Sequence, residues 1–277
     1  GVGLDCCMRH THDTRMTVQD ALAGTDIAKT DAEMLLCTIL QQNRAWLLAH
    51  ATDELSAEQE AQWHAAANRR RKGEPVAYIL GEREFYGRKF FVDRRVLIPR
   101  QCTESLIDGV KKVLLTRCDS LTKIDPDIVA WTKVLQKTME SKTIVDVGTG
   151  SGCLAITLAL EVPDLQIFAL DVSKAALDVA RANAKQHGVE DRILFLESNL
   201  LDELPKDIAP FLIVSNPPYL SVTGDSVQQE VREWEPSVAL FADNNGSRVI
   251  DQLVKQASDH PQCVGWVMEC EDRQTKI

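Results

Sequence analysis

The segment IVSNPPYLS, residues 213–221, places a carboxamide, two prolines and a tyrosine directly after a run of apolar residues. The Asn216 side-chain oxygen and the Pro217 carbonyl are both hydrogen-bond acceptors. Pro217 and Pro218 restrict the backbone, so the two acceptors stay fixed. Two fixed acceptors suit a planar NH2 group, because both of its N–H bonds find partners and its nitrogen is held for reaction. Tyr219 adds a ring that can pack against a substrate or near a cation.

A second candidate is the glycine-rich segment VDVGTGSG, residues 145–152, between an apolar strand-like run and a helix-like run. Glycines at such a junction let the backbone turn tightly and approach a ligand. The first N–H groups of the following helix attract an anion. Asp171 ends the next expected strand, where folds of this kind place the acidic residue that binds ribose hydroxyls. The candidate ligand-binding residues of this region are Asp146, Gly148, Thr149, Gly150, Gly152 and Asp171.

Each of these segments also has an interpretation without a ligand. A glycine-rich junction can be no more than a tight strand-to-helix turn, and an Asn-Pro-Pro segment can be a turn that ends a strand. The presence of both segments in one chain favours the functional interpretation.

The surrounding sequence predicts the elements that position both segments. From about residue 143, apolar strand-like runs alternate with segments of helical periodicity. The expected strands are TIVDVG, LQIFALDV, RILFLES, FLIVS and VGWVMEC, with helices between them. This alternation is typical of an α/β fold with a doubly wound, mostly parallel sheet, a Rossmann-like arrangement. Both segments then lie at the carboxyl ends of strands, where such sheets bind ligands.

The first part of the chain has a different pattern. Residues 17–72 carry apolar residues at helical spacing, with a capping box at Ser56 and Gln59 and a helix stop at Gly73. Aromatic and β-branched residues around Gly87 predict a β-hairpin, and RVLIPR after it predicts a short strand. The sequence therefore predicts a helical domain at 17–73, a hairpin linker at 74–100 and an α/β domain at 101–277.

Composition excludes several classes of function. The chain has 277 residues, a net charge of -10 and a pI of about 5.1, which disfavours non-specific binding to a nucleic-acid backbone. The basic run at 69–72 is interpreted as a solvated helix end. Eight cysteines without a Cys-x-x-Cys pair provide no metal site. No membrane-length apolar run or secretion signal is present in the sequence, so we expect a soluble protein that is not secreted.

Several segments carry a resemblance to known enzymes. The G-x-G-x-G loop, with an acid two residues before its first glycine, resembles the S-adenosylmethionine site of class I methyltransferases. The wider pattern resembles the release-factor glutamine N5-methyltransferases of bacteria and organelles. It is carried by EPVAYILGEREFYGRKFFVDRRVLIPR (74–100), VDVGTGSGCLAI (145–156), LIVSNPPY (212–219) and VREWEPSVAL (231–240).

This resemblance implies methyl transfer from S-adenosylmethionine to the glutamine of a Gly-Gly-Gln motif in peptide chain release factors. It implies that the helical domain helps to dock the release factor, in the cytoplasm or in an organellar matrix. The residues implied to hold the glutamine are Asn216, Pro217, Pro218, Tyr219, Arg100 and Glu104. Of these, Asn216, Pro217 and Tyr219 are implied to be catalytic. The residues implied to hold the cofactor are Asp146, Gly148, Thr149, Gly150, Gly152, Asp171, Asn199 and Asn216.

The chain departs from that family at several positions. Gln101 and Cys102 replace a Pro-Glu pair, and Asn199 replaces an aspartate near the adenine. Residues 117–142 look like an insertion. The family continues for two more strands after the fifth, whereas this sequence stops at Ile277. The C-terminal end of the domain therefore looks truncated, and VGWVMEC is expected to be an unpaired edge. Three alternatives therefore stay open: a ribosomal-protein glutamine methyltransferase, a nucleic-acid adenine-N6 methyltransferase, and a non-catalytic protein that binds S-adenosylmethionine or a release factor.

Overall fold

The structure is a computed structural model that describes residues 15–115, 140, 142–221, 228–243 and 246–270. The predicted insertion at 117–142 lies almost entirely outside the described residues. Contacts between Cα atoms divide the chain into two compact units, one ending at Leu80 and the other beginning at Gly81.

The first unit is helical, as the apolar spacing predicts. Its helices are α1 (Val18–Ala23), α2 (Lys29–Leu40), α3 (Arg44–Ala49), α4 (Ala57–Arg71) and α5 (Val76–Leu80). The Ser56–Gln59 capping box begins α4, and Gly73 follows that helix with a φ of 84°. The short helix α5 was not predicted, because residues 74–80 were assigned to the hairpin linker. Buried side chains of α1, α2, α3 and α4 form one core around Leu35, Leu36 and Trp63.

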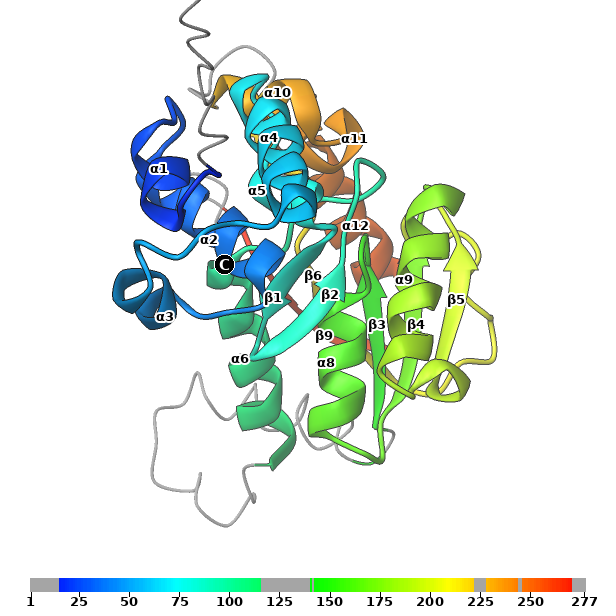
Figure 1. Ribbon diagram of the computed structural model, residues 1–277. Coiled ribbons are helices and arrows are strands. Elements are labelled where there is room, and N and C mark those ends of the chain that lie inside the picture. The colour runs from blue at the N-terminus through cyan, green and yellow to red at the C-terminus, as the bar shows by residue number, and fades with distance from the viewer. Residues whose placement is uncertain (1–14, 116–139, 141, 222–227, 244–245, 271–277) are drawn as a thin grey trace, which may run out of the picture. The chain divides into compact units, whose positions relative to one another are not determined.

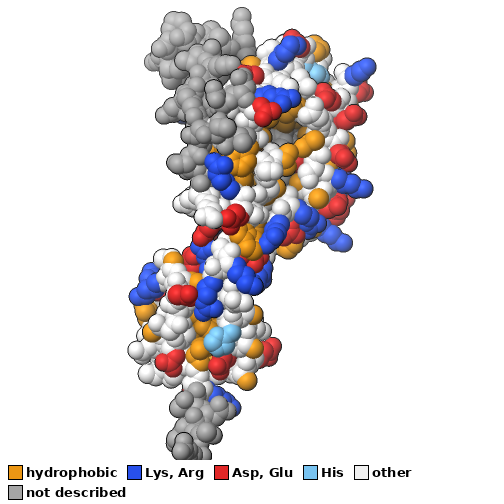
Figure 2. Space-filling view, turned by 90° about the horizontal axis from the view of Figure 1, so that it is seen from above, with side chains coloured by type: hydrophobic (Ala, Val, Ile, Leu, Met, Phe, Trp, Pro, Cys, Tyr) orange, Lys and Arg blue, Asp and Glu red, His pale blue; other side chains and the backbone are white. Residues whose placement is uncertain are grey.

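The arginine run at the end of α4 forms ion pairs within this unit. Arg69 bonds to Glu74 at 2.6 Å, Arg70 to Asp31 at 2.6 Å and Arg71 to Asp26 at 2.6 Å. The positive charge of the run is therefore locally balanced. Over the face seen in Figure 2, basic and acidic side chains are interspersed and do not gather into a patch of one sign.

The second unit contains a five-stranded parallel sheet in the order β5-β4-β3-β6-β9. Its strands are β3 (Thr143–Val147), β4 (Gln166–Asp171), β5 (Ile193–Glu197), β6 (Phe211–Ser215) and β9 (Cys263–Met268). The chain proceeds from β3 outward to β5 and then returns to the other side of β3 with β6. This reversal is a topological switch point, and the crevice at its carboxyl end is where open α/β sheets bind ligands.

Helices cover both faces of this sheet (Figure 1). On one face, α6 (Glu104–Leu115), α8 (Cys153–Glu161) and α9 (Lys174–Gln186) pack with Ile144 of β3 and Val214 of β6. On the other, α12 (Arg248–Asp259) packs with Val145 of β3 and Ile213 of β6. Because successive residues of a strand point to opposite faces, continuous apolar runs are needed to fill both cores.

A β-hairpin formed by β1 (Glu82–Phe85) and β2 (Arg88–Phe91) packs on the α8–α9 face. The buried side chain of Asn183, on α9, accepts from the Phe91 N–H at 2.8 Å. It donates to the Phe91 carbonyl at 3.0 Å and to the Ser151 carbonyl at 2.8 Å. The hairpin is thus held to the second helix after the glycine loop.

The predicted strand at 95–100 is wrong. Residues 93–96 form a turn in which the Val96 N–H donates to the Asp93 carbonyl at 3.1 Å. The Ile98 N–H donates to the carboxylate of Glu235 at 3.0 Å, and Pro99 has no N–H. These backbone groups therefore do not pair with a neighbouring strand.

Short elements complete the second unit: η1 (Gln101–Thr103), η3 (Glu190–Arg192), β7 (Leu220–Ser221), α10 (Gln229–Trp234), α11 (Ser237–Leu240) and β8 (Phe241–Ala242). The last strand, β9, pairs only with β6 among the described strands, and residues 271–277 lie outside the described part. None of the described helices is long and apolar enough to cross a membrane.

Candidate active site

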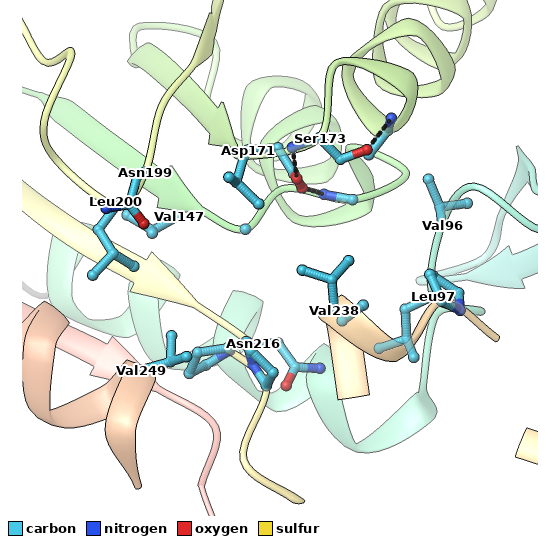
Figure 3. A pocket seen from close by; sticks show the side chains of 18 of the residues that line it. Val96, Leu97, Val147, Asp171, Ser173, Asn199, Leu200, Asn216, Val238 and Val249 are labelled. Carbon is cyan, nitrogen blue, oxygen red and sulfur yellow. Dashed lines mark hydrogen bonds between the residues drawn. The ribbon is translucent and has the colours of Figure 1, made fainter. Parts of the chain in front are cut away.

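A cavity of about 280 Å³ lies at the carboxyl ends of β3, β4, β5 and β6. It is lined by the glycine loop, by Asp171 at the end of β4 and Ser173 after it, by Ser198–Leu200 after β5 and by Asn216–Pro218 after β6. Asp171 and Asn216 lie on opposite sides of it in Figure 3. Two of its lining residues, Val172 and Val238, are 55% and 56% exposed, although they are large and apolar. Apolar side chains left open to a cavity suit a ligand with an apolar face.

The N–H groups of the glycine loop bond within the protein. Those of Gly148 and Thr149 donate to the Leu170 carbonyl at 2.8 and 2.9 Å, and that of Gly152 donates to the Thr149 carbonyl at 2.8 Å. Gly148 and Gly150 have φ values of 72° and 55°, a conformation that favours glycine. These three N–H groups are therefore satisfied within the protein, and the expectation that the first N–H groups of the following helix attract an anion stays a prediction about α8. Gly148 and Gly150 present glycine backbone to the cavity.

Asp146 lies behind the loop and does not line the cavity. Its Oδ2 accepts from the Thr149 hydroxyl at 2.7 Å and from the Ala155 N–H at 3.2 Å, in the first turn of α8. It therefore caps a helix whose N-cap residue, Gly152, has no side chain. Its Oδ1 is buried without a partner among the described residues, and burial raises the pKa of this carboxyl to about 7.

Asp171, the last residue of β4, joins the loop to the next helix. Its Oδ2 accepts from the Gly150 N–H at 2.9 Å, and its Oδ1 accepts from the Ser173 N–H at 2.9 Å (Figure 3). Burial raises the pKa of the Asp171 carboxyl above its usual range, against the effect of these two bonds. Each carboxylate oxygen can accept more than one bond, so Asp171 retains capacity for ligand hydroxyls.

Asn199 lines the cavity beyond β5, and its amide donates to Asp202 Oδ2 at 3.0 Å. The hydroxyl of Ser198, beside it, donates to the Leu200 carbonyl at 2.8 Å. This turn places Asn199 and the apolar residue Leu200 at the cavity edge.

A second cavity, of about 260 Å³, adjoins the first, and the residues that line both are Leu97, Asn216, Pro217 and Ala239. Its other walls include Arg100, Tyr219 and the apolar residues Val231 and Leu240. The Asn216–Pro217 pair therefore lies where the two cavities meet. A group bound in one can there approach a group bound in the other.

Side chains from two distant segments hold Asn216 and Tyr219. The Asn216 Nδ2 donates to the Thr103 hydroxyl at 3.0 Å, and that hydroxyl donates to Glu269 Oε2 at 2.7 Å. The Tyr219 hydroxyl donates to Glu269 Oε1 at 3.0 Å, and the Cys102 thiol reaches the same oxygen at 3.3 Å. Glu269 directly follows β9, and its N–H donates to the Ser215 carbonyl at 3.0 Å.

The two remaining predicted residues differ in position. Arg100 lines the second cavity and donates to Glu235 Oε1 at 2.6 Å, and the Glu235 side chain is only 1% exposed. Glu104 lines neither cavity. Its Oε1 accepts from the Tyr86 N–H at 2.8 Å in the hairpin turn, where Tyr86 has a φ of 51°.

The structure thus brings part of the predicted set together around the two cavities: Gly148, Gly150, Asp171, Asn199, Asn216, Pro217, Pro218, Tyr219 and Arg100. It places Asp146, Thr149, Gly152 and Glu104 outside the cavity walls, where they support the loop, its helix or the hairpin. Sequence reasoning missed Thr103, Glu235 and Glu269. The only signal for them was their place in the three segments IPRQCTE, VREWEP and VGWVMEC.

Comparison with known proteins agrees with this architecture. The PrmC N-terminal domain family matches residues 16–81, and the methyltransferase small domain family matches residues 120–233. The chain is 38% identical to the release factor glutamine methyltransferase of Koribacter versatilis, over 89% of this chain and 80% of that protein. It is 41% identical to that of Chlorobaculum tepidum, over 78% of this chain and 69% of that protein.

A third relative, the bifunctional methyltransferase of Rickettsia bellii, is 39% identical over 80% of this chain and 41% of that protein. The chain therefore spans less than half of this bifunctional relative. Given its identity to single-function relatives over most of both sequences, the chain belongs to the release factor glutamine methyltransferase family.

Proposed function

We propose that this protein transfers a methyl group from S-adenosylmethionine to the side-chain nitrogen of the glutamine in the Gly-Gly-Gln motif of a peptide chain release factor. The observation that carries this proposal is the position of Asn216 and Pro217 between two adjoining cavities. One cavity has the glycine loop and an acidic residue, and the other has a tyrosine and an arginine among apolar walls.

The residues of the first cavity fit S-adenosylmethionine. Asp171 has acceptor capacity for the ribose hydroxyls, and Val172 and Val238 offer exposed apolar surface to the adenine ring. Gly148 and Gly150 allow a close approach to the amino-acid part. When bound, this cofactor supplies an electrophilic methyl group on a sulfonium.

The second cavity fits the glutamine side chain. An amide nitrogen is a poor nucleophile because its lone pair is delocalised, so positioning must supply much of the rate. Asn216 Oδ1 and the Pro217 carbonyl accept one N–H bond each, which fixes the nitrogen at the junction. With the cofactor bound, Asn216 and Pro217 would hold the nitrogen while it gains a bond to the methyl carbon, the carbon–sulfur bond would break, and one N–H proton would pass to solvent. Acceptors aimed at a nitrogen that gains positive charge favour the transition state.

The remaining residues have supporting roles in this proposal. Asp146, Thr149 and Gly152 hold the glycine loop, Asn199 contacts the adenine from the turn after β5, and Tyr219 packs against the substrate chain. The helical unit docks the release factor, in the cytoplasm or in the organellar matrix where translation terminates. The balanced charge of the arginine run disfavours a nucleic-acid substrate.

The test is methyl transfer from labelled S-adenosylmethionine to purified release factor, and to the same factor with its Gly-Gly-Gln glutamine replaced by alanine. We expect label on the first protein and none on the second. Asn216→Ala should lose most of the transfer. Gln166→Ala, which removes an exposed carboxamide at the end of β4 opposite the cavity, should keep it.

The other outcomes are also informative. Equal labelling of both release factors would refute the assignment of the methylated glutamine. Cofactor binding by calorimetry without transfer to either release factor would favour a non-catalytic protein or the ribosomal-protein substrate.

A further inference from the structure

Four side chains at the junction form one chain of hydrogen bonds with a definite direction. Asn216 donates to Thr103 at 3.0 Å, and Thr103 donates to Glu269 at 2.7 Å. Tyr219 donates to the other oxygen of Glu269 at 3.0 Å. Thr103 is 2% exposed, so its hydroxyl depends on protein partners and not on water.

The chemistry of these groups decides the direction. An ionised carboxylate only accepts hydrogen bonds, so Thr103 must give its single proton to Glu269. The Thr103 oxygen can then only accept from residue 216. Asn216 must therefore turn its NH2 group toward Thr103, which leaves its oxygen for the cavities that it lines.

We infer that Glu269 is a positioning residue that fixes which end of the Asn216 carboxamide faces the substrate, and that it makes a carboxamide necessary at position 216. This inference rests on the proposed function. Without this constraint the carboxamide could turn over and present its NH2 group to the substrate NH2, two donors with no acceptor between them. An aspartate at 216 would place a second carboxylate against a hydroxyl that has only one proton.

The first experiment removes the hydroxyl that links the two residues. Thr103→Val keeps the side-chain shape, Thr103→Ser keeps the hydroxyl, and Thr157→Val is a matched control. The Thr157 hydroxyl, on α8, is buried without a hydrogen-bond partner among the described residues. We expect Thr103→Val to lower kcat by about 10-fold to 100-fold, since small misplacement of reacting groups has effects of this order. The dissociation constant of S-adenosylmethionine should change by less than about twofold, and Thr103→Ser should recover most of kcat.

The second experiment reverses the chain of bonds. In Asn216→Asp two carboxylates compete for the Thr103 proton, so transfer should fall. Adding Glu269→Gln lets the new amide donate to Thr103, which then donates to Asp at 216, while the amide oxygen still accepts from Tyr219. The double variant should therefore be at least about 10-fold more active than Asn216→Asp alone. Glu190→Gln, at an exposed carboxylate beyond the far end of β5, should give no such recovery in the same background.

The outcomes separate this inference from the proposed function. If the parent protein does not label the release factor, the proposed function fails, and the melting temperatures of the same variants still test the direction of the bonds. Recovery of the melting temperature in the double variant supports the inference. The inference would be overturned if the effects of Asn216→Asp and Glu269→Gln were additive in both activity and melting temperature. It would also be overturned if the Thr103→Val variant had the same kcat as the Thr157→Val variant.

Discussion

Gly152→Ala tests whether the third loop glycine serves packing and not ligand binding. Gly152 has a φ of 80°, which strains any residue with a Cβ atom. A Cβ built on it would lie 2.9 Å from Ile156 Cδ1, 3.2 Å from Ala180 Cβ and 3.3 Å from Ala180 Cα. The Ile156 end can rotate, but Ala180 belongs to α9 and has no flexible atoms to move. The substitution must therefore push α8 and α9 apart.

The magnitude follows from two contributions to the free energy of unfolding. The left-handed conformation costs about 1–2 kcal/mol for an L-residue. Overpacking of a close contact costs about 1–3 kcal/mol more. Gly188→Ala isolates the first contribution, because its φ is 69° and its added Cβ would meet nothing within 4 Å. We expect a loss of about 2–5 kcal/mol for Gly152→Ala and about 1–2 kcal/mol for Gly188→Ala.

Thermal unfolding measures this difference directly. For a unit of this size, each kcal/mol shifts the melting temperature by about 2–4 °C, so Gly152→Ala should melt several degrees below Gly188→Ala. Gly148→Ala is the complementary case, since Gly148 lines the cavity and its added Cβ would also meet nothing within 4 Å. It should melt near Gly188→Ala but bind S-adenosylmethionine more weakly in calorimetry. Equal melting temperatures for Gly152→Ala and Gly188→Ala would refute the packing argument.

Three further predictions concern buried polar groups. Asn183→Leu removes the side-chain partner of three backbone groups, one buried at Ser151 and two part-buried at Phe91, so the urea midpoint should fall by an amount equivalent to on the order of 3 kcal/mol, with an unchanged m-value. Burial raises the pKa of Asp146 from 3.8 to about 7, so its carboxyl keeps a proton that the unfolded chain releases. Its stabilising contribution is complete below about pH 4 and is lost as the pH rises through about 7. Asp146→Asn should therefore shrink the fall in melting temperature between pH 5 and pH 8. Arg100→Met leaves buried Glu235 without its ion-pair partner and should cost about 3–5 kcal/mol in urea unfolding. Adding Glu235→Gln, which removes the charge but keeps an acceptor for the Ile98 N–H, should recover most of that loss.

Sequence reasoning predicted the α/β fold well because the signals are local and strong. Strands buried on both faces must be continuously apolar, and β3 and β6 are such strands. The capping box at Ser56 correctly predicts where α4 begins. The strand predicted at 95–100 failed because an apolar, β-branched run is equally compatible with a segment whose N–H groups bond elsewhere. The partner of Ile98 is Glu235, which is 137 residues away, so no local pattern records it.

The residues of the candidate site also divide into those that local sequence signals locate and those that only the fold brings together. Residues that face the cavities through backbone or by their place at a strand end were found, because motif and topology together locate them. The residues that orient them were not found: Thr103 is 113 residues from Asn216 and 166 from Glu269. Only the parallel order of β3, β6 and β9 brings the ends of the last two strands beside η1.

The departure at Cys102 is now also interpretable, since its thiol contacts Glu269 without interrupting the bond from Thr103. A substitution at position 102 changes a side chain beside the hydrogen-bond chain. It leaves the direction of that chain intact, because Thr103 and Tyr219 still donate to Glu269.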